Sequence, residues 1–265
     1  MKNLKRRFFI KSSSLVAGGL VLPSFNINRM ANSANNKKLK VSVVGCGGRG
    51  TGAAVQALRA DENVELVAMA DAFKDRLEKS LNAIKQEFEG EKKIEVKEKN
   101  MLVGFNGYKK AIDLADVVIL ATPPGFRPLH FKYAIDQDKH VFMEKPVATD
   151  AHGVRQVLET AKVANQKKLN VVVGLQRRYQ YSYLNILKQV RRGVIGKITS
   201  GQVRWNGAGV WVRERQPNQT EMEYQMRNWY YFNWLCGDHI VEQHIHNIDV
   251  ANWFINEFPV SAQGM

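Results

Sequence analysis

Cysteine is scarce in this chain, and long apolar runs, internal repeats and metal-binding spacings are missing from it. Cys46 and Cys236 are the only cysteines among 265 residues, so a disulfide framework is excluded, and we expect both thiols to be buried as small apolar side chains. No stretch beyond residue 33 has the length of a membrane-spanning helix, and no spacing of Cys and His indicates zinc or another metal. These absences favour a globular protein of one or two domains.

Acidic residues are fewer than basic ones, but much of the imbalance lies at the N-terminus. The chain has 39 Lys and Arg against 25 Asp and Glu, a formal net charge of +14. Residues 1–33 hold six of the basic residues and no acidic ones, so without them the net charge is +8. The other charges are scattered, and no nucleic-acid-binding motif is present. We therefore expect a small-molecule partner, and a nucleic-acid binder held by charge alone is the least favoured class.

The first 33 residues have the pattern of an export signal. A twin arginine lies within K-R-R-F-F-I-K at residues 5–11, and the uncharged stretch Ser12–Pro23, too short to span a bilayer, follows it. We expect twin-arginine export to the periplasm, with A-N-S at residues 31–33 as a candidate cleavage site. A frayed basic N-terminus of a cytoplasmic protein is the alternative.

Between residues 39 and 178, apolar segments alternate with helical stretches of mixed charge. The expected strands are 39–45, 64–71, 117–122, 140–143 and 170–175, with a less regular one over Val96–Gly104, and the helices between them include 74–89, 126–138 and 150–168. This alternation is typical of βαβ units, and continuous apolar runs fit strands buried on both faces. The sequence predicts an α/β Rossmann domain over residues 39–178, with a doubly wound parallel sheet.

Residues 179–265 have a different pattern and predict a second, α+β domain. We expect a helix over 181–193, an antiparallel strand over Ile195–Trp205 and a helix through Gln243–Trp253. Aromatic residues between them can stack on a sugar or simply pack together. Residues 259–265 have the pattern of a strand without a partner. We therefore expect a substrate and oligomerisation domain whose open antiparallel sheet is incomplete in this chain.

The first expected strand runs straight into Gly45, Gly47 and Gly50 at the G-x-G-x-x-G spacing. Gly45 permits the tight turn, Gly47 leaves bare backbone for a pyrophosphate, and Gly50 allows close helix–strand packing. Gly48 and Arg49 lie in the same turn, where a helix N-terminus offers its free N–H groups to phosphates. The pattern predicts a dinucleotide site.

The second expected strand ends at Asp71, 21 residues beyond the last of these glycines. A carboxylate at that position can accept hydrogen bonds from the adenosine ribose hydroxyls, which favours NAD over NADP. Lys74 and Arg76 follow closely and could accompany a 2′-phosphate, so NADP stays as the less favoured cofactor.

The later strands also end in candidate ligand-binding residues, at the sheet edge where open α/β sheets bind ligands. Thr122 and Pro123 close one strand, and His130 follows on the next helix, where a surface position is as plausible as a ligand contact. Arg177 and Arg178 close the last strand, and an arginine fork there suits a carboxylate or sugar hydroxyls. A pair of solvated arginines is the alternative.

One strand ends in Glu144-Lys145-Pro146, where charges face a cleft. A lysine there can take a proton from a substrate hydroxyl as hydride leaves, provided that burial or a neighbouring cation lowers its pKa. Pro146 fixes the turn and admits a cis bond, which gives the lysine a defined position.

The motifs G-C-G-G-R-G, A-T-P-P, E-K-P and I-H-N-I-D together resemble the Gfo/Idh/MocA family of NAD(P)-dependent oxidoreductases, which act mainly on sugars, polyols and related hydroxyl compounds. The resemblance extends over residues 39–265. It implies that Lys145 is the catalytic lysine, in contact with nicotinamide and substrate, and that the segment of Arg177 and the acid Glu144 border the same site.

The resemblance also implies a catalytic pair on a helix of the second domain, because family members commonly carry D-x-x-x-H there. Alignment on I-H-N-I-D assigns His246 and places Glu242, a longer acid, at the aspartate position. Four residues apart, they share one helix face. From the residues alone, His246 is equally a satisfied core histidine, and its choice over His244 rests on the resemblance.

Taken together, the sequence predicts a periplasmic NAD-dependent oxidoreductase for a carbohydrate or polyol, a dimer or tetramer if the second domain is complete. A soluble NAD pool is not expected outside the cytoplasm, so the coenzyme would stay bound and be recycled. Redox-neutral cleavage of a glycosidic bond would achieve this and make the protein a glycosidase. A non-catalytic dinucleotide- or sugar-binding protein is the second alternative.

Overall fold

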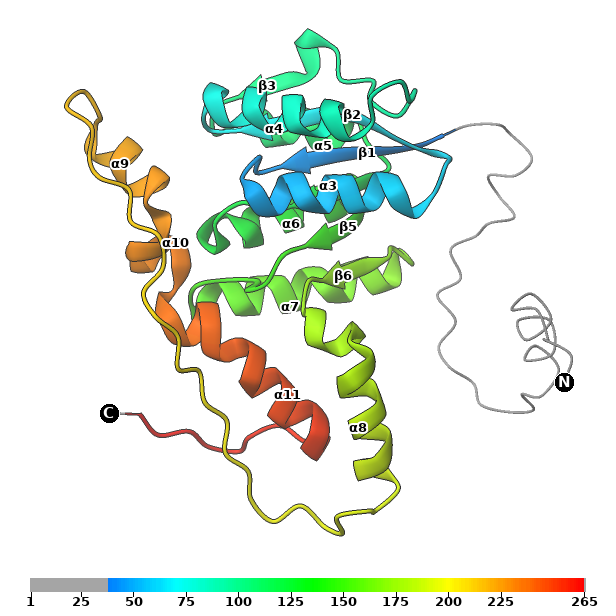
Figure 1. Cartoon of the computed structure of the whole chain (residues 1–265), viewed down its shortest axis with the longest axis vertical. Helices are drawn as coiled ribbons and strands as arrows, with labels where there is room; N and C mark the ends of the chain where they lie inside the picture. Colours follow the sequence, from blue (N-terminus) through cyan, green and yellow to red (C-terminus); the bar gives the residue numbers. More distant parts are fainter. Residues whose placement is uncertain (1–37, 265) are drawn as a thin grey trace, which may run out of the picture. The chain divides into compact units, whose positions relative to one another are not determined.

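The computed structural model describes residues 38–264, and these form one parallel sheet with helices on both faces, followed by a helical region (Figure 1). The sheet has the strand order β3-β2-β1-β4-β5-β6, and every pair of neighbours is parallel. Its strands are β1 (Leu39–Val44), β2 (Val64–Asp71), β3 (Met101–Val103), β4 (Val117–Leu120), β5 (His140–Met143) and β6 (Val171–Val173). The winding reverses between β1 and β4, and ligands bind beyond the carboxyl ends of strands at such a point.

Helices cover both faces of this sheet and give it two apolar cores. The helices are α3 (Gly48–Ala60), α4 (Lys74–Glu87), α5 (Gly107–Asp113), α6 (Arg127–Asp136) and α7 (Ala151–Gln166). Side chains of α3 and α4, including Leu58 and Ile84, pack in one core, and those of α5, α6 and α7, including Phe131, pack in the other. Successive residues of β1 point to opposite cores, Val43 to the first and Val44 to the second. The predicted doubly wound α/β sheet is confirmed.

The irregular strand predicted over Val96–Gly104 forms only in part. Ile94 makes an isolated bridge to Leu66, a turn of 3-10 helix, η1 (Glu98–Asn100), follows, and β3 begins at Met101. The buried side chain of Asn100 donates a hydrogen bond of 3.0 Å to the carbonyl oxygen of Val67. A side chain rather than the backbone of this segment thus binds β2 at Val67, and the backbone pairing begins at Met101.

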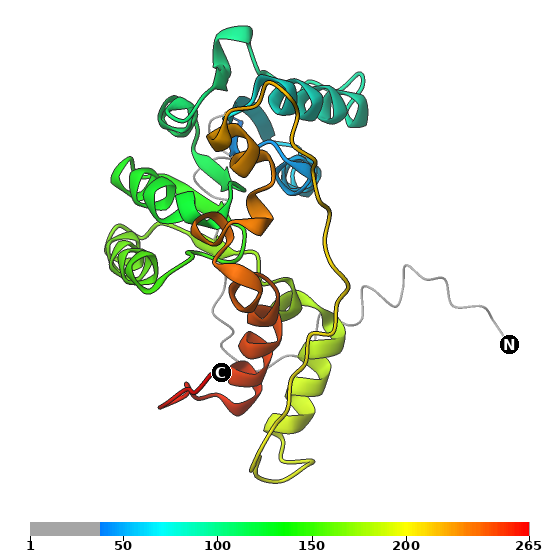
Figure 2. The same cartoon turned by 90° about the vertical axis from the view of Figure 1, so that its left-hand side faces the viewer.

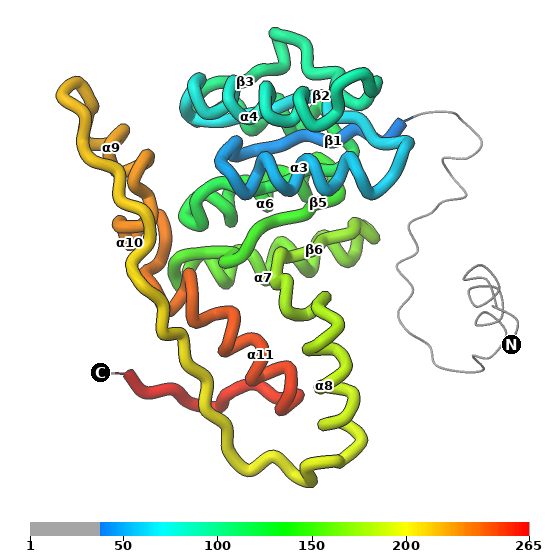
Figure 3. Tube along the Cα trace, viewed as in Figure 1, coloured from blue at the N-terminus to red at the C-terminus, as the bar shows by residue number. Residues whose placement is uncertain are grey.

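The region after β6 is built from short helices joined by extended chain. It contains η3 (Gln176–Tyr179), α8 (Tyr181–Arg191), α9 (Glu221–Arg227), η4 (Trp229–Tyr231), α10 (Asn233–Cys236), the π-helical turn η5 (Ile240–His244) and α11 (Ile245–Ile255). Residues 198–216, drawn in yellow, run as an irregular segment past α11 towards α9 (Figures 2 and 3). Thr220 begins α9, because its hydroxyl accepts a bond from the Glu223 N–H.

The antiparallel strand predicted over Ile195–Trp205 is wrong, and the last described residues, 259–264, form no strand either. Alternating side chains become a strand only where a neighbouring chain satisfies the backbone N–H and C=O groups. Within residues 38–264 there is no second sheet that could provide such a neighbour.

Three sequence-based expectations outside the sheet concern membrane spans, the N-terminal signal and the cysteines. None of the helices in the described part combines the length and apolarity needed to cross a bilayer. The predicted export signal, residues 1–33, lies outside the described residues. Cys46 and Cys236 are both free and buried, as predicted.

Candidate active site

At two positions in the turn after β1, neighbouring backbone lies so close that only glycine fits. Gly45 has a φ of +98°, and a Cβ there would lie 2.6 Å from backbone atoms of Ala121 and Thr122. A Cβ on Gly50 would lie 1.9 Å from the carbonyl oxygen of Gly45. The turn, α3 and the end of β4 are therefore in direct backbone contact.

Gly47 and Gly48, in contrast, face open space at the N-terminus of α3. A Cβ on Gly48 would meet nothing within 4 Å, and the nearest atom to one on Gly47 would be Arg76 Nη1, at 3.8 Å. No side chain caps α3, and its first turn contains no acidic residue. Free N–H groups beside open space fit a diphosphate, so the residues present suit a dinucleotide.

Asp71 ends β2 directly beside this turn. Its two carboxylate oxygens accept hydrogen bonds from the N–H of Cys46, at 2.7 Å, and the N–H of Phe73, at 2.9 Å. Burial raises the pKa of Asp71, although these N–H donors and Arg76 oppose the change. A cavity of about 220 Å³ opens in front of the carboxylate, which keeps lone pairs for further donors such as ribose hydroxyls.

Thr122, Pro123 and His130 line the same cavity. His130 is 5% exposed, its Nδ1 lies 3.2 Å from Thr122 Oγ1, and its ring packs 4.2 Å from that of Tyr108. Burial, and then the charge of Arg127, lower the pKa of His130 to about 3, so the imidazole is neutral at neutral pH. The surface interpretation of His130 is wrong, because α6 is covered by α5 on this side.

Arg127, which the sequence analysis did not single out, connects the turns after β4 and β5. It is 2% exposed and donates hydrogen bonds to the carbonyl oxygens of Thr122 and Pro146. Burial lowers the pKa of Arg127 to about 10, and the carboxylates of Glu242 and Glu144 oppose the change. The guanidinium is thus still a cation at neutral pH, next to two buried acids.

Lys145 meets Glu242 across a sequence separation of 97 residues. The Lys145 side chain is 14% exposed, its Nζ lies 3.3 Å from Glu242 Oε2, and it also donates to the Glu242 carbonyl oxygen. The bond between Lys145 and Pro146 is cis. Burial raises the pKa of Glu242, and the Lys145 ammonium counteracts this. Glu242 Oε1 has no hydrogen-bond partner among the described residues.

His246 lies one turn beyond Glu242, at the start of α11. It is 6% exposed, and its ring stacks on Trp205 at 5.8 Å between centres. Burial, followed by the charges of Lys145 and Arg177, lowers the pKa of His246 to about 4, so the ring is neutral at neutral pH. Its Nδ1 has no partner within the part of the chain described. The alternative, His244, instead lies with its Nε2 3.1 Å from that of His239.

Arg49 bridges the glycine turn and the Lys145 turn. Its guanidinium, on a side chain that is 67% exposed, forms an ion pair with Glu144, whose side chain is 9% exposed. Gly174, after β6, leaves room for this acid, because a Cβ there would lie 2.9 Å from Glu144 Oε2. The exposed Arg49 side chain thus links the glycine turn after β1 to the Glu144-Lys145 turn after β5.

Arg177 and Arg178 are held by α11, so the interpretation as solvated arginines is wrong. Arg178 binds the Asp249 carboxylate through Nε, at 2.9 Å, and Nη2, at 2.6 Å. Arg177 donates to Asn247 and lies 5.5 Å from the Trp205 ring centre. The polar residues of H-N-I-D, on a helix, were the only sequence feature that indicated such partners. They did not indicate which arginine would bind Asn247 and which would bind Asp249.

The predicted residues therefore gather in two places. Around the cavity by β2 lie Gly45, Gly47, Asp71, Thr122, Pro123 and His130. Around Lys145 lie Glu144, Arg177, Glu242 and His246, with Arg127 behind them. An ammonium, a carboxylate and a neutral imidazole, two of them with unpartnered atoms, can bind a hydroxyl group and move its proton. No group of three potential metal ligands occurs among residues 38–264.

Comparison with families and curated proteins identifies relatives over most of the chain. The family described as "Oxidoreductase family, NAD-binding Rossmann fold" (GFO_IDH_MocA) matches residues 39–174. An α-N-acetylgalactosaminidase of Shewanella oneidensis is 26% identical over 251 residues, covering 86% of this chain and 50% of the relative. An inositol 2-dehydrogenase of Rhizobium meliloti is 26% identical over 206 residues, covering 78% and 52%. The chain spans about half the length of the curated relatives it matches.

Solved structures share the fold. A myo-inositol 2-dehydrogenase from Lactobacillus plantarum has 24% identity and a TM-score of 0.58, over 83% of this chain and 57% of that one. A scyllo-inositol dehydrogenase from Lactobacillus casei, with bound NAD(H) and scyllo-inositol, has 22% identity and a TM-score of 0.57, over the same 83% and 57%. A 3-ketoreductase from Actinomadura kijaniata, in complex with NADP, has 19% identity and a TM-score of 0.58, over 83% and 58%. At these identities the likeness shows the fold alone.

Proposed function

The chain belongs to the Gfo/Idh/MocA oxidoreductase family, and from that premise we propose that it binds NAD and transfers hydride between the coenzyme and a hydroxyl-bearing carbon of a sugar, polyol or glycoside. The observation that carries the proposal is the meeting of Lys145, Glu242 and His246 at the edge of a dinucleotide-binding sheet. The inositol 2-dehydrogenase of Rhizobium meliloti, a relative in sequence, supports this substrate class.

The coenzyme would lie across the ends of β1, β2 and β4. Gly47, Gly48 and the free N–H groups of α3 would hold the diphosphate, and Asp71 would accept from the ribose hydroxyls. We favour NAD because the Asp71 carboxylate would repel a 2′-phosphate. Arg76, which faces Asp71, keeps NADP as the second choice.

The nicotinamide ring supplies hydride acceptance and donation when the coenzyme is bound. In its neutral amine form, Lys145 Nζ would accept the proton of the substrate hydroxyl while the C–H hydrogen leaves with its electron pair for the nicotinamide ring. Glu242, 3.3 Å away, would stabilise the ammonium so formed. The neutral ring of His246 would bind a second hydroxyl through its unpartnered Nδ1 and orient the carbon. Arg127 would fix the Lys145 turn relative to Thr122.

Replacing Lys145 tests this assignment. We expect Lys145→Met to retain NADH binding and to lower turnover about 10³-fold, the scale of a lost acid–base group. Turnover is measured as NADH formation with a panel of polyols and sugars, and binding by NADH fluorescence. Lys132→Met, an exposed lysine on α6, is the matched control and should match the wild type. Equal activity of both variants would contradict the proposal, and binding without turnover in the wild type would favour a non-catalytic binding protein.

A second candidate is redox-neutral glycoside hydrolysis, favoured by the name of the α-N-acetylgalactosaminidase relative. Oxidation of one hydroxyl to a carbonyl, elimination of the aglycone, addition of water to the double bond so formed and re-reduction of the carbonyl would together consume no coenzyme. Aryl glycosides in deuterated water separate the candidates: a glycosidase releases the phenol without net NADH and incorporates deuterium next to the transient carbonyl. A dehydrogenase accumulates NADH in proportion to product.

We also propose export by the twin-arginine route, on the strength of residues 5–23. The full chain with Arg6→Lys and Arg7→Lys should stay in the cytoplasm, while the unchanged chain reaches the periplasm. Equal distribution of both in cell fractionation would contradict the proposal.

A further inference from the structure

One wall of the cavity beside Asp71 comes from the second region of the chain. Met226, in α9, and Trp229, in η4, line it together with Asp71 and Phe73. Met226 is buried. In Figure 1, α9 lies beyond the carboxyl end of β1, on the side where α3 and α4 begin. A group bound in front of Asp71 is therefore covered from the α9 side.

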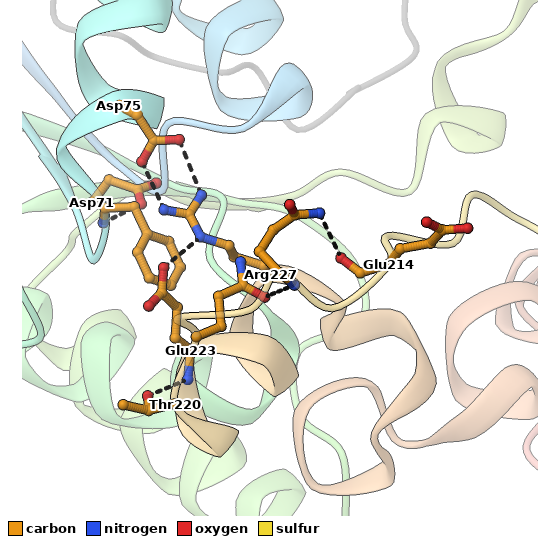
Figure 4. Close-up of polar contacts among 9 residues, drawn as sticks. Asp71, Asp75, Glu214, Thr220, Glu223 and Arg227 are labelled. Atoms are coloured by element: carbon orange, nitrogen blue, oxygen red, sulfur yellow. Dashed lines mark hydrogen bonds and ion pairs between the residues drawn. The ribbon is translucent and has the colours of Figure 1, made fainter.

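An ion pair joins α9 to the residues that follow β2. Arg227 donates two hydrogen bonds to the Asp75 carboxylate, at 3.0 and 2.9 Å, across a separation of 152 residues. Its guanidinium also lies 4.0 Å from the centre of the Phe73 ring. Glu223 accepts from Arg227 Nε at 2.9 Å and orients the side chain. Figure 4 shows Arg227 reaching from α9 to Asp75, with Glu223 on its other side.

Arg227 and Asp75 shift each other's pKa, although both side chains are partly exposed to solvent. Arg227 lowers the pKa of Asp75, and Asp75 raises the pKa of Arg227. The Arg227 side chain is 22% exposed and that of Asp75 is 64% exposed. A cleft of about 1710 Å³ is lined by α3, α4 and residues of the segment 212–227, and it shares Gly47 and Arg76 with the cavity beside Asp71. The contact between α9 and the residues after β2 is therefore open to solvent.

We propose that α9 and η4 form a latch over the adenosine half of the bound dinucleotide, and that the Arg227–Asp75 pair holds this latch closed. The proposal rests on the proposed coenzyme binding. A covered adenosine leaves only when the pair opens, so the pair sets how long the coenzyme stays. Long residence is what an enzyme that recycles its coenzyme in place requires.

Release of NADH from the full chain tests the latch. NADH fluorescence is followed in a stopped-flow chase with excess NAD. We expect Arg227→Met and Asp75→Asn each to accelerate release about fivefold, which corresponds to about 1 kcal/mol and to one exposed ion pair with a cation–π contact. Arg227→Lys, which keeps the charge but loses the two-pronged bond, should fall between.

Two half-ligands locate the effect. ADP-ribose contains the adenosine half, and nicotinamide mononucleotide lacks it. We expect Arg227→Met to weaken ADP-ribose about fivefold in calorimetry and to leave nicotinamide mononucleotide unchanged. The control is Lys162→Met with Glu159→Gln, which removes an exposed 2.8 Å pair on α7 outside the latch and should change neither.

Each outcome decides a different claim. Wild-type release rates in a folded Arg227→Met protein, verified by thermal melting, would overturn the latch while leaving coenzyme binding intact. Equal weakening of both half-ligands would overturn its placement over adenosine. No NADH binding by the wild-type chain would overturn the proposed function itself.

Discussion

The two regions of this chain are held together by different forces. Residues 39–178 form a sheet that is buried on both faces by two apolar cores. Within residues 179–264 the buried apolar side chains are few, namely Leu187, Met226, Leu235 and Cys236. Large apolar side chains such as Tyr181 and Phe258 stay 85% and 88% exposed there.

The second region reaches the first through three charged contacts in addition to packing such as that of Trp234 against Phe126. Lys145 meets Glu242, Arg178 meets Asp249, and Arg227 meets Asp75. The wall of the proposed site that the first region forms is therefore fixed by steric packing, and the wall that the second region forms depends on charge as well as packing. Changes of pH and salt should act mainly on the second wall, whereas added side-chain volume should act mainly on the first.

The steric half of this comparison is tested by adding one methyl group at two glycines of the same turn. Gly50→Ala should lower the free energy of unfolding by at least about 3 kcal/mol, because its Cβ would lie 1.9 Å from the Gly45 oxygen. Gly48→Ala, whose Cβ meets nothing within 4 Å, should change stability by less than about 0.5 kcal/mol. Urea unfolding measures both. Equal stability of the two variants would show that the turn relaxes and is not set by packing.

Arg127 belongs to the first region but faces the acids of both. Arg127→Met should cost about 2–3 kcal/mol of folding stability, because it leaves two carbonyl oxygens without their donor and removes a buried cation close to two buried carboxylates. Arg127→Lys should recover part of the loss. If the methionine variant were as stable as the wild type in denaturant melts, the buried cation would not hold the two turns together.

The charged half is tested by the pH dependence of stability at His246. Its pKa is lowered from 6.5 to about 4 by folding, so between these pH values the unfolded chain binds more protons than the folded one. The free energy of unfolding should thus rise by about 2–3 kcal/mol from pH 4 to 6.5 and level off above about pH 7.5. His246→Asn should remove this rise. Parallel stability curves of the wild type and the variant across this window would contradict the burial of the ring.

The smallest effect is expected at the Arg178–Asp249 pair. Asp249→Asn should lower the unfolding free energy by about 0.5–1 kcal/mol, since the arginine is partly solvated, and by less in high salt. Glu159→Gln, in an exposed pair on α7 of the first region, should have no measurable effect. A salt-independent loss at Asp249 would mean that packing rather than charge joins α11 to η3.

The sheet could be predicted from sequence because its signals are local. β5 has the predicted bounds, His140–Met143, since a short apolar run lies between polar residues on both sides. The strand expected over Ile195–Trp205 had the same kind of local signal and failed, because a strand also needs a neighbour that the local pattern does not specify.

The site could be predicted where it follows the strand ends and not where it depends on contacts between distant segments. Asp71 and Lys145 follow from the ends of β2 and β5. The burial of Arg127 could not be predicted, because the residues around an arginine in a helix do not indicate whether its side chain is buried. The partners of Arg177 and Arg178 on α11 depend on how two helical segments pack, and spacing along the chain does not fix that.

The two cysteines give this comparison a built-in reporter. Cys46 lies in the glycine turn and is 4% exposed, and Cys236 ends α10 and is 1% exposed, so each region carries one sealed thiol. Burial raises the pKa of both thiols, which keeps them unreactive in the closed state. Alkylation therefore requires local unfolding around the thiol. The alkylation rate of each cysteine measures how often the structure around it opens. Mass spectrometry of a partly labelled sample should find Cys236 modified first, with coenzyme slowing Cys46 further.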